Sequence, residues 1–332
     1  MGNFQDALTY YDQAYQIRER LKLNDDMAES LHNLAETNVE LGQYDKAVAQ
    51  YLKALEIRRN SGDVNGVAVN SSSLGALFTE QGKYASALSA LQESLKDFQQ
   101  TNDQTWLMAE ATGRYGNALS QVGRWDEGQK NLAEAIKLAT DVKNDTVLAQ
   151  ALNYLGDSYF YRGDYSMAQQ QYDRALQVAT RSKSRELLAV TRFNLARLGV
   201  VQGHPAASLP VLKKLVEEFD SLGLKALSVQ ASVYLAQALL ATNKPQDAQQ
   251  ELDRALNRAE KLGLLIEQAR AHFMMGEIYS RTGKTNEYAP PYQEAVRILE
   301  SISKENGADR LLERSDLKDM YQQAVKSYQG SA

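Results

Sequence analysis

The sequence predicts an all-α solenoid in which one two-helix unit is stacked again and again. Three observations lead to this fold class: a glycine recurs about every forty residues, a large residue followed by Gly or Ala recurs upstream of it, and apolar residues recur at helical spacing downstream. A fixed period of this size indicates a copied and stacked supersecondary unit. The composition agrees, since only 5 Pro and 20 Gly occur in 332 residues.

The recurring glycines mark the turn inside each unit. Each lies between two apolar-periodic stretches, where a helix ends and a residue with positive φ is needed. Glycine adopts that conformation without a Cβ penalty, and the asparagine that replaces it once also tolerates it. The steps are 40 or 41 residues. The series is Gly2, Gly42, Gly82, Gly123, Gly163, Gly203, Asn243 and Gly283.

A second signature predicts close helix packing within each unit. A Gly inside a helix costs about 1 kcal/mol of propensity, so its recurrence at one register implies a crossing with no room for a side chain. Downstream, Ala47, Tyr51 and Ala54 form an i, i+4, i+7 stripe, which is the helical period. The upstream pairs are Leu34-Ala35, Leu74-Gly75, Tyr115-Gly116, Leu155-Gly156, Leu195-Ala196, Leu235-Ala236 and Met275-Gly276.

These positions resemble the tetratricopeptide repeat (TPR), with its large–Gly/Ala pair in helix A, its Gly-x-aromatic turn and its Ala-x3-aromatic-x2-Ala stripe in helix B. The resemblance covers nearly the whole chain. It implies a right-handed superhelix whose concave groove binds a peptide or protein. The period of about 40 exceeds the usual 34, so each helix should run to about 17 residues, or roughly 26 Å. This longer variant is similar to spindle-orientation adaptors, kinesin light chains and bacterial peptide-sensing regulators.

The elements can be assigned in order. Residues 1–22 should be a partial repeat that holds only a helix B, which predicts a fragment of a longer protein. Residues 23–303 should form seven units, and Pro290 and Pro291 should delay the last helix B to near residue 291. Residues 309–328 should form a capping helix. The A helices are expected to begin near residues 26, 64, 105, 146, 185, 225 and 265.

Charge and composition exclude several function classes. A formal net charge of −5 argues against general nucleic-acid binding, which needs a basic face. The absence of Cys excludes disulfides and thiolate chemistry. No apolar run approaches the roughly 18–20 residues of a membrane span, and no signal peptide is recognisable. The three His fall in different units, so we predict no metal, no cofactor and no enzymatic activity, in a protein expected to be cytoplasmic.

The groove-facing side chains can be inferred from helical geometry. Relative to the small residue of each helix A, positions six and three before it and one, four and five after it should point away from the packing seam. The N-terminal third of this groove is acidic, and its C-terminal half is apolar with arginines. The candidate binding residues are Glu36, Asn117, Asn153, Asp157, Phe160, Tyr161, Phe193, Arg197, Gln237, Arg270, Phe273 and Glu277.

Two functions remain open at this point. The first is a non-enzymatic scaffold that binds an extended or helical protein segment in the groove, with the acidic end favouring a basic segment. The alternative is a sensor or regulatory segment of a larger signalling protein, a kinase or transcription regulator, that binds a ligand or its own effector domain. The N-terminal edge, with Phe4, Leu8, Tyr11 and Tyr15 as its apolar candidates, would also allow a homodimer.

Overall fold

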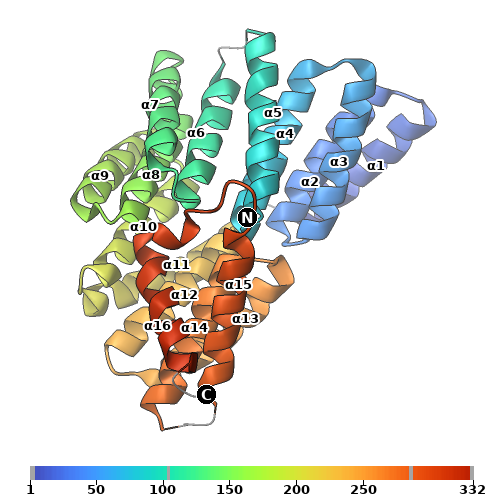
Figure 1. Cartoon of the computed structure of the whole chain (residues 1–332). Coiled ribbons are helices and arrows are strands. Elements are labelled where there is room, and N and C mark those ends of the chain that lie inside the picture. The colour runs from blue at the N-terminus through green and yellow to red at the C-terminus, as the bar shows by residue number, and fades with distance from the viewer. Residues whose placement is uncertain (1–3, 103–104, 284–286, 330–332) are drawn as a thin grey trace.

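The computed structural model describes residues 4–102, 105–283 and 287–329 of the chain. This described part is an all-α solenoid of sixteen α-helices and one short 3-10 helix, with no strand (Figure 1). The fold class predicted from the repeat period is therefore confirmed. Within the described residues, no helix combines the length and the apolar character that a membrane span requires.

Helices alternate between an inner and an outer layer. The A helices pack on one another along the inner layer, and each B helix packs outside against the A helices that flank it. The inner helices are α2 (Asn24–Glu40), α4 (Val64–Gln81), α6 (Trp106–Gln121), α8 (Asp145–Arg162), α10 (Arg185–Val201), α12 (Lys225–Ala241) and α14 (Leu265–Arg281). The outer helices are α1 (Phe4–Arg20), α3 (Tyr44–Ser61), α5 (Tyr84–Gln100), α7 (Trp125–Asp141), α9 (Tyr165–Ser182), α11 (Pro205–Leu222), α13 (Pro245–Leu262) and α15 (Ala289–Ser303).

The turn series has the backbone conformation predicted for it. Gly163 has φ 90° and Asn243 has φ 59°, so the asparagine does take the left-handed conformation. A second series, in the turns between units, is also left-handed and follows the same spacing. This series could not be recognised in the sequence because its positions hold lysine, asparagine or glycine. The positions are Lys22, Gly62, Asn102, Lys143, Lys183, Gly223 and Gly263.

The small residues of the A helices lie at tight crossings with the following B helix. A Cβ added at Gly156 would lie 2.3 Å from the Tyr172 ring, and one at Gly116 would lie 2.8 Å from Leu132. Tyr172 and Leu132 hold equivalent positions of their B helices, and both are fully buried. The small residues of the A helices therefore leave the space into which side chains of the helix B stripe pack.

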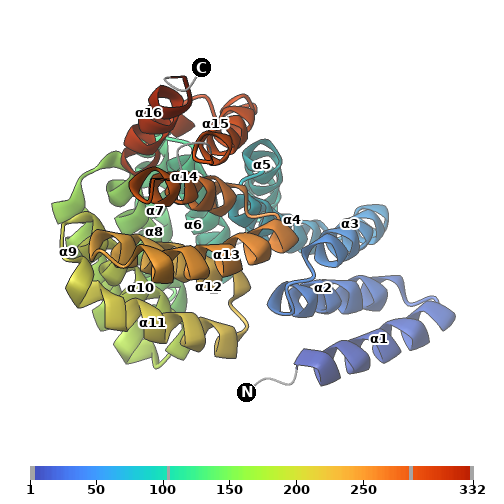
Figure 2. The same cartoon turned by 90° about the horizontal axis from the view of Figure 1, so that it is seen from below.

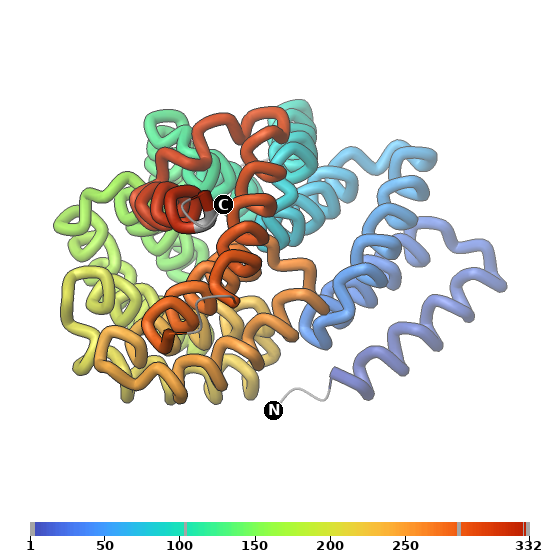
Figure 3. The backbone as a smooth tube through the Cα atoms, turned by 60° about the horizontal axis from the view of Figure 1, so that its bottom comes forward, coloured from blue at the N-terminus to red at the C-terminus, as the bar shows by residue number. Residues whose placement is uncertain are grey.

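The solenoid curls so far that its two halves meet. Figures 2 and 3 show the C-terminal helices α13 and α15 returning to the side of α4 and α5. Gln81 Nε2 donates to the Leu262 carbonyl at 3.0 Å, and the Ala85 amide donates to Glu305 at 2.9 Å. One apolar cluster joins Tyr84 and Leu88 with Ile298, Leu299 and Leu311. The sequence predicted a concave groove, and these contacts join the two ends of the solenoid around it.

The C-terminal segment differs from the expected capping helix. The 3-10 helix η1 (Leu311–Glu313) precedes α16 (Ser315–Gln329), and Arg314 between them is extended, with φ −58° and ψ 131°. Helix α16 thus begins later than residue 309, and the Arg314 side chain that precedes it is buried. In α15, Pro290 and Pro291 occupy the first turn, where no intrahelical N–H donor is lost.

The N-terminal helix packs on α2 through part of the face that was expected to be open. Tyr15 accepts a hydrogen bond from Lys53 at 2.6 Å, and it packs against the cluster of Ala28, Leu31 and Ala54. Phe4, Leu8 and Tyr15 are only half exposed. The exposed apolar side chains of α1 are instead Tyr10, Tyr11 and Ile17.

Candidate ligand-binding cavity

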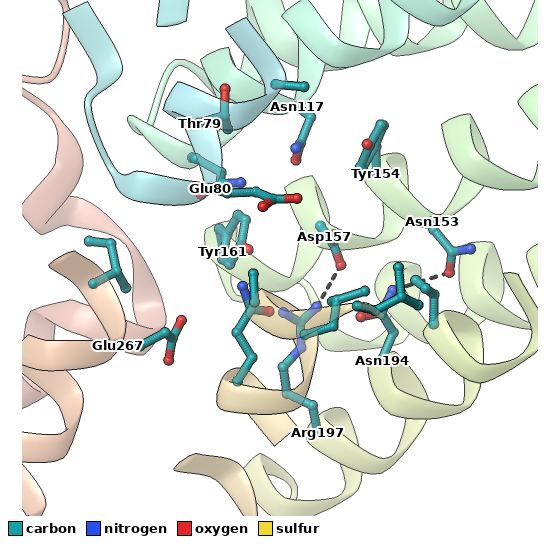
Figure 4. A pocket seen from close by; sticks show the side chains of 18 of the residues that line it. Thr79, Glu80, Asn117, Asn153, Tyr154, Asp157, Tyr161, Asn194, Arg197 and Glu267 are labelled. Atoms are coloured by element: carbon teal, nitrogen blue, oxygen red, sulfur yellow. Dashed lines mark hydrogen bonds and ion pairs between the residues drawn. The ribbon is translucent and has the colours of Figure 1, made fainter. Parts of the chain in front are cut away.

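The closed solenoid surrounds a cavity at its centre. This central cavity has a volume of about 230 Å³ and is lined by the inner faces of α4, α6, α8, α10, α12 and α14. Arg314 completes the wall from the C-terminal segment. Figure 4 shows side chains of these helices converging on the same space. The solenoid thus brings together residues from six repeats.

A buried ion pair forms part of the cavity floor. Arg197 Nη2 donates to Asp157 Oδ1 at 2.5 Å and to the Tyr172 hydroxyl at 2.8 Å. The Tyr172 hydroxyl in turn donates to Asp157 Oδ1 at 2.7 Å. The Arg197 guanidinium also lies 4.3 Å from the centre of the Phe160 ring, a cation–π contact. Burial raises the pKa of Asp157, although Arg197 and the hydrogen bonds oppose that rise.

A second buried network ties the C-terminal segment to the cavity wall. Arg314 donates to both oxygens of Asp316, at 2.8 and 3.0 Å, and to the Gln121 carbonyl at 3.2 Å. Its guanidinium stacks 3.9 Å from the centre of the Tyr161 ring. Arg270 reaches the same Asp316 carboxylate. Burial opposes ionisation of Asp316, but the two arginines prevail and lower its pKa to about 2.

Asparagine side chains in the wall of the central cavity form hydrogen bonds between neighbouring repeats. Asn153 Nδ2 donates to Thr191 Oγ1 at 2.9 Å and to the Ala149 carbonyl at 3.1 Å, while its Oδ1 accepts from Asn194 at 3.1 Å. The sequence suggested that Asn153 could bond a ligand, but these contacts use its amide. Asn117 differs, because its Oδ1 is buried without a hydrogen-bond partner in the described structure.

An adjoining cavity, the acidic cavity, has a volume of about 200 Å³ and shares Ala76, Glu80, Arg114, Tyr154 and Glu186 with the central one. Four carboxylates line it, from Glu36, Glu40, Glu80 and Glu186. The Tyr44 hydroxyl donates to Glu80 at 3.1 Å, and the Tyr51 hydroxyl donates to Glu36 at 2.5 Å.

The pKa values of three acidic-cavity carboxylates are raised, and at Glu186 the cause is burial. Desolvation, Glu186, Glu36 and Glu80 raise the pKa of Glu40 to about 7. Desolvation, opposed by Tyr44 and Arg114, raises the pKa of Glu80 to about 7. The Glu80 side chain is exposed, and it lines both cavities. The acidic cavity is therefore a place where negative charge is poorly neutralised.

The structure places most of the sequence-predicted residues on these surfaces. Asn117, Asn153, Asp157, Tyr161, Arg197 and Arg270 line the central cavity, and Glu36 lines the acidic one. Gln237, Phe273 and Glu277 lie apart from them, around a smaller cavity of about 90 Å³ next to Asp316 and Met320.

Two of the predicted residues are core side chains instead. Phe160 and Phe193 are 0% and 1% exposed. Phe193 packs edge-on against Phe219 and Tyr234, and Phe160 packs against Tyr165. Both rings pack into the core between helices, so the expectation that they face the groove is corrected.

Sequence reasoning missed an entire register position of the cavity wall. Arg114, Tyr154, Asn194 and Tyr234 each lie two residues before the small residue of their helix and line the central cavity. A signal for this position was available in the sequence. The position six before the small residue was already expected to face the groove, and the position two before it lies four residues further on, on the same helical face. Arg314 had no such signal, because its segment lies outside the repeat pattern.

Comparison with known proteins agrees with this architecture. The chain is 24% identical over 214 residues to the 43 kDa receptor-associated protein of the synapse from Tetronarce californica, covering 64% of this chain and 51% of that protein. The chain thus spans about half the length of the curated relatives it matches.

Solved structures resemble the whole chain at low sequence identity. A Rap protein complexed with Competence and Sporulation Factor superposes with a TM-score of 0.60 at 10% identity, covering 98% of this chain and 99% of that one. The Rap conjugation gene regulator of plasmid pLS20, in complex with the Phr* peptide, gives 0.57 at 12% identity, covering 99% and 95%. The profile of the MalT-like TPR region matches residues 1–267, and the chain belongs to this TPR family.

Proposed function

We propose that this protein is a non-enzymatic scaffold that binds a peptide or protein segment in the central and acidic cavities. One observation carries the proposal: buried polar atoms of the cavity wall lack hydrogen-bond partners in the described structure. They are Asn117 Oδ1, Arg197 Nε, Glu267 Oε2 and Arg270 Nε. Buried polar groups are normally satisfied, and a bound main chain offers both donors and acceptors to such groups.

The size of the site is consistent with a short segment. The two adjoining cavities together fall within the range of about 300–1,000 Å³ that is typical of ligand pockets. A longer segment would require the seam between α4 and α13 to open. The fold relatives solved with Competence and Sporulation Factor and with the Phr* peptide support a ligand of this class.

Filling the cavity tests the proposal without removing a structural contact. Ala76 lines both cavities, so Ala76→Phe should occupy the space that the ligand needs. Purified protein is presented with an immobilised positional-scanning hexapeptide library. We expect the native chain to retain a subset of sequences and A76F to lose them.

A matched control separates filling from general damage. Ala133→Phe places the same ring on the exposed face of α7 and should leave peptide capture unchanged. Circular dichroism checks that both variants remain folded. If A76F remains folded and captures peptides at the native level, the peptides do not bind in these two cavities.

The second candidate function is a sensor or regulatory segment of a larger signalling protein. The closed seam favours it, because a ligand entering the cavity would act on contacts between residues far apart in the chain, such as Gln81 and Leu262. Small-angle scattering with and without a captured hexapeptide checks this function. An unchanged radius of gyration would count against it.

A further inference from the structure

The arginines of the central cavity are each matched by a carboxylate. Arg114 Nη2 lies 3.0 Å from Glu110, and Arg197 Nη2 lies 2.5 Å from Asp157. Arg270 and Arg314 share Asp316. These cations are therefore committed to partners within the protein.

The carboxylates of the acidic cavity are not matched in this way. Glu40, Glu80 and Glu186 have no ion pair within 4 Å in the part of the chain that the structure describes, and Glu36 has only the neighbouring His32 at 3.8 Å. Lys225 also lines this cavity, and Arg114 lines it while bound to Glu110. Four acids thus face one uncommitted lysine.

The side-chain oxygen of Asn117, in the wall of the central cavity, independently indicates that a ligand with a hydrogen-bond donor binds there. Asn117 is 9% exposed, and its Oδ1 has no partner among the described residues. Figure 4 shows its amide and the Glu80 carboxylate pointing into the same part of the central cavity. Both groups accept hydrogen bonds, so the ligand that completes them must donate.

An organic cation fits these acceptors better than a metal ion. The described residues contain no group of three or more acidic, His or Cys side chains arranged to hold a metal. A Lys ammonium offers three donors and an Arg guanidinium five, each with a positive charge that offsets the clustered carboxylates.

We infer that the bound peptide inserts a Lys or Arg side chain at the junction of the two cavities, between Glu80, Glu186 and Asn117. This inference rests on the proposed function, since the cation belongs to the peptide bound there. The remaining acids of the acidic cavity, Glu36 and Glu40, add to the negative field and attract the same group.

The hexapeptide library, screened at about pH 8 where the carboxylates are ionised, reads the inference out directly. We expect the native chain to enrich peptides with Lys or Arg at one position. Glu80→Gln and Glu186→Gln should each weaken binding of an enriched peptide at least about tenfold, because a charged acceptor is lost beside a desolvated cation. Glu134→Gln, on the exposed face of α7, is the matched control and should change nothing.

A free-cation arm distinguishes the peptide from a small amine. L-argininamide and spermidine are titrated into the native chain and E80Q while the melting temperature is followed. A rise with the native chain alone supports the cation site whether or not peptides bind.

The outcomes separate the two proposals. Peptides enriched without any Lys or Arg preference would overturn the cation inference and leave peptide binding standing. A response to the free amines with no peptide retained would overturn peptide binding and leave the cation site. Neither response would overturn both.

Discussion

Asp157 and Arg197 hold the same register position in successive repeats and form a buried ion pair with a separation of 2.5 Å. Asp157 is on α8 and Arg197 on α10, so the pair locks two inner helices together. Substituting one partner leaves the other charge buried and uncompensated, which typically costs 3–5 kcal/mol.

The pair can be tested by single and double substitution. We expect Arg197→Met to lower the free energy of unfolding by about 3–5 kcal/mol, measured by urea denaturation. Asp157→Leu combined with Arg197→Met should recover much of that loss, since no unpaired charge remains. Equal losses in the single and double variants would show that the loss does not come from the unpaired Asp157 charge.

The helix crossings make a second prediction, at Gly156. Gly156→Ala places a Cβ 2.3 Å from the Tyr172 ring and should cost about 1–3 kcal/mol through overpacking. Gly113→Ala is the matched control, because its Cβ would lie 3.6 Å from Ala135, an ordinary contact. There the gain in helix propensity should make the change neutral or stabilising. Similar melting temperatures for the two variants would contradict this account of the seam.

The repeat spacing explains which features could be predicted from the sequence. Gly156 and Asn243 could be assigned to a crossing and a turn because steric needs at those points select particular residues. Residues of the cavity wall could be predicted from the helical period wherever their position clearly faces inward, as for Asp157 and Arg197. Phe160 and Phe193 lie at the edge of that face, where a small rotation decides between groove and core.

Closure of the solenoid could not be predicted in the same way. Curvature accumulates from small rotations between repeats, and no single residue encodes it. The contacts that complete it, such as Gln81 with the Leu262 carbonyl, join residues with no shared motif. Arg314 belongs to a segment outside the repeat, so its place in the cavity wall had no periodic signal.

Arg314 supports a third prediction, on closure. Arg314→Met removes the contacts to Asp316 and the Gln121 carbonyl and should lower the free energy of unfolding by about 1–3 kcal/mol, because Asp316 keeps Arg270 as its partner. Hydrogen exchange should speed up in α16 and at the end of α6, which the arginine joins. Arg310→Met is the control, because Arg310 pairs with Glu313 at the surface and such pairs contribute about 0–1 kcal/mol. Exchange rates that rise equally in both variants would show that Arg314 does not hold the C-terminal segment against α6.

Self-association remains a prediction, now centred on different residues. Tyr10 and Ile17 on α1 are 69% and 51% exposed, whereas Leu8 and Tyr15 are half-buried. If α1 forms the dimer contact, Ile17→Lys should convert a dimer to a monomer in light scattering after size exclusion. Gln13→Lys adds the same charge on this helix at a position without apolar surface and should have a smaller effect. A native chain that is monomeric at high concentration would end the dimer prediction.

The acidic cavity predicts an unusual pH dependence for the unliganded protein. Glu80 faces Tyr44 on α3, Glu36 and Glu40 on α2, Arg114 on α6 and Glu186 on α10. Its pKa of about 7 in the folded chain exceeds the ordinary value of a glutamate. Between these two values the folded state holds more protons than the unfolded state, so stability falls as the pH rises through that window.

Glu80→Gln should flatten this dependence between about pH 5 and pH 8, because a neutral amide replaces the carboxylate that must ionise. The measurement is the free energy of unfolding against pH for the native chain, E80Q and the surface control E134Q. Two histidines act in the opposite direction, since burial lowers the pKa of His32 and His272, but they are common to all three proteins and cancel in the comparison. Parallel profiles for native and E80Q would mean that Glu80 ionises as readily in the folded chain as in the unfolded chain, so burial would not oppose its negative charge.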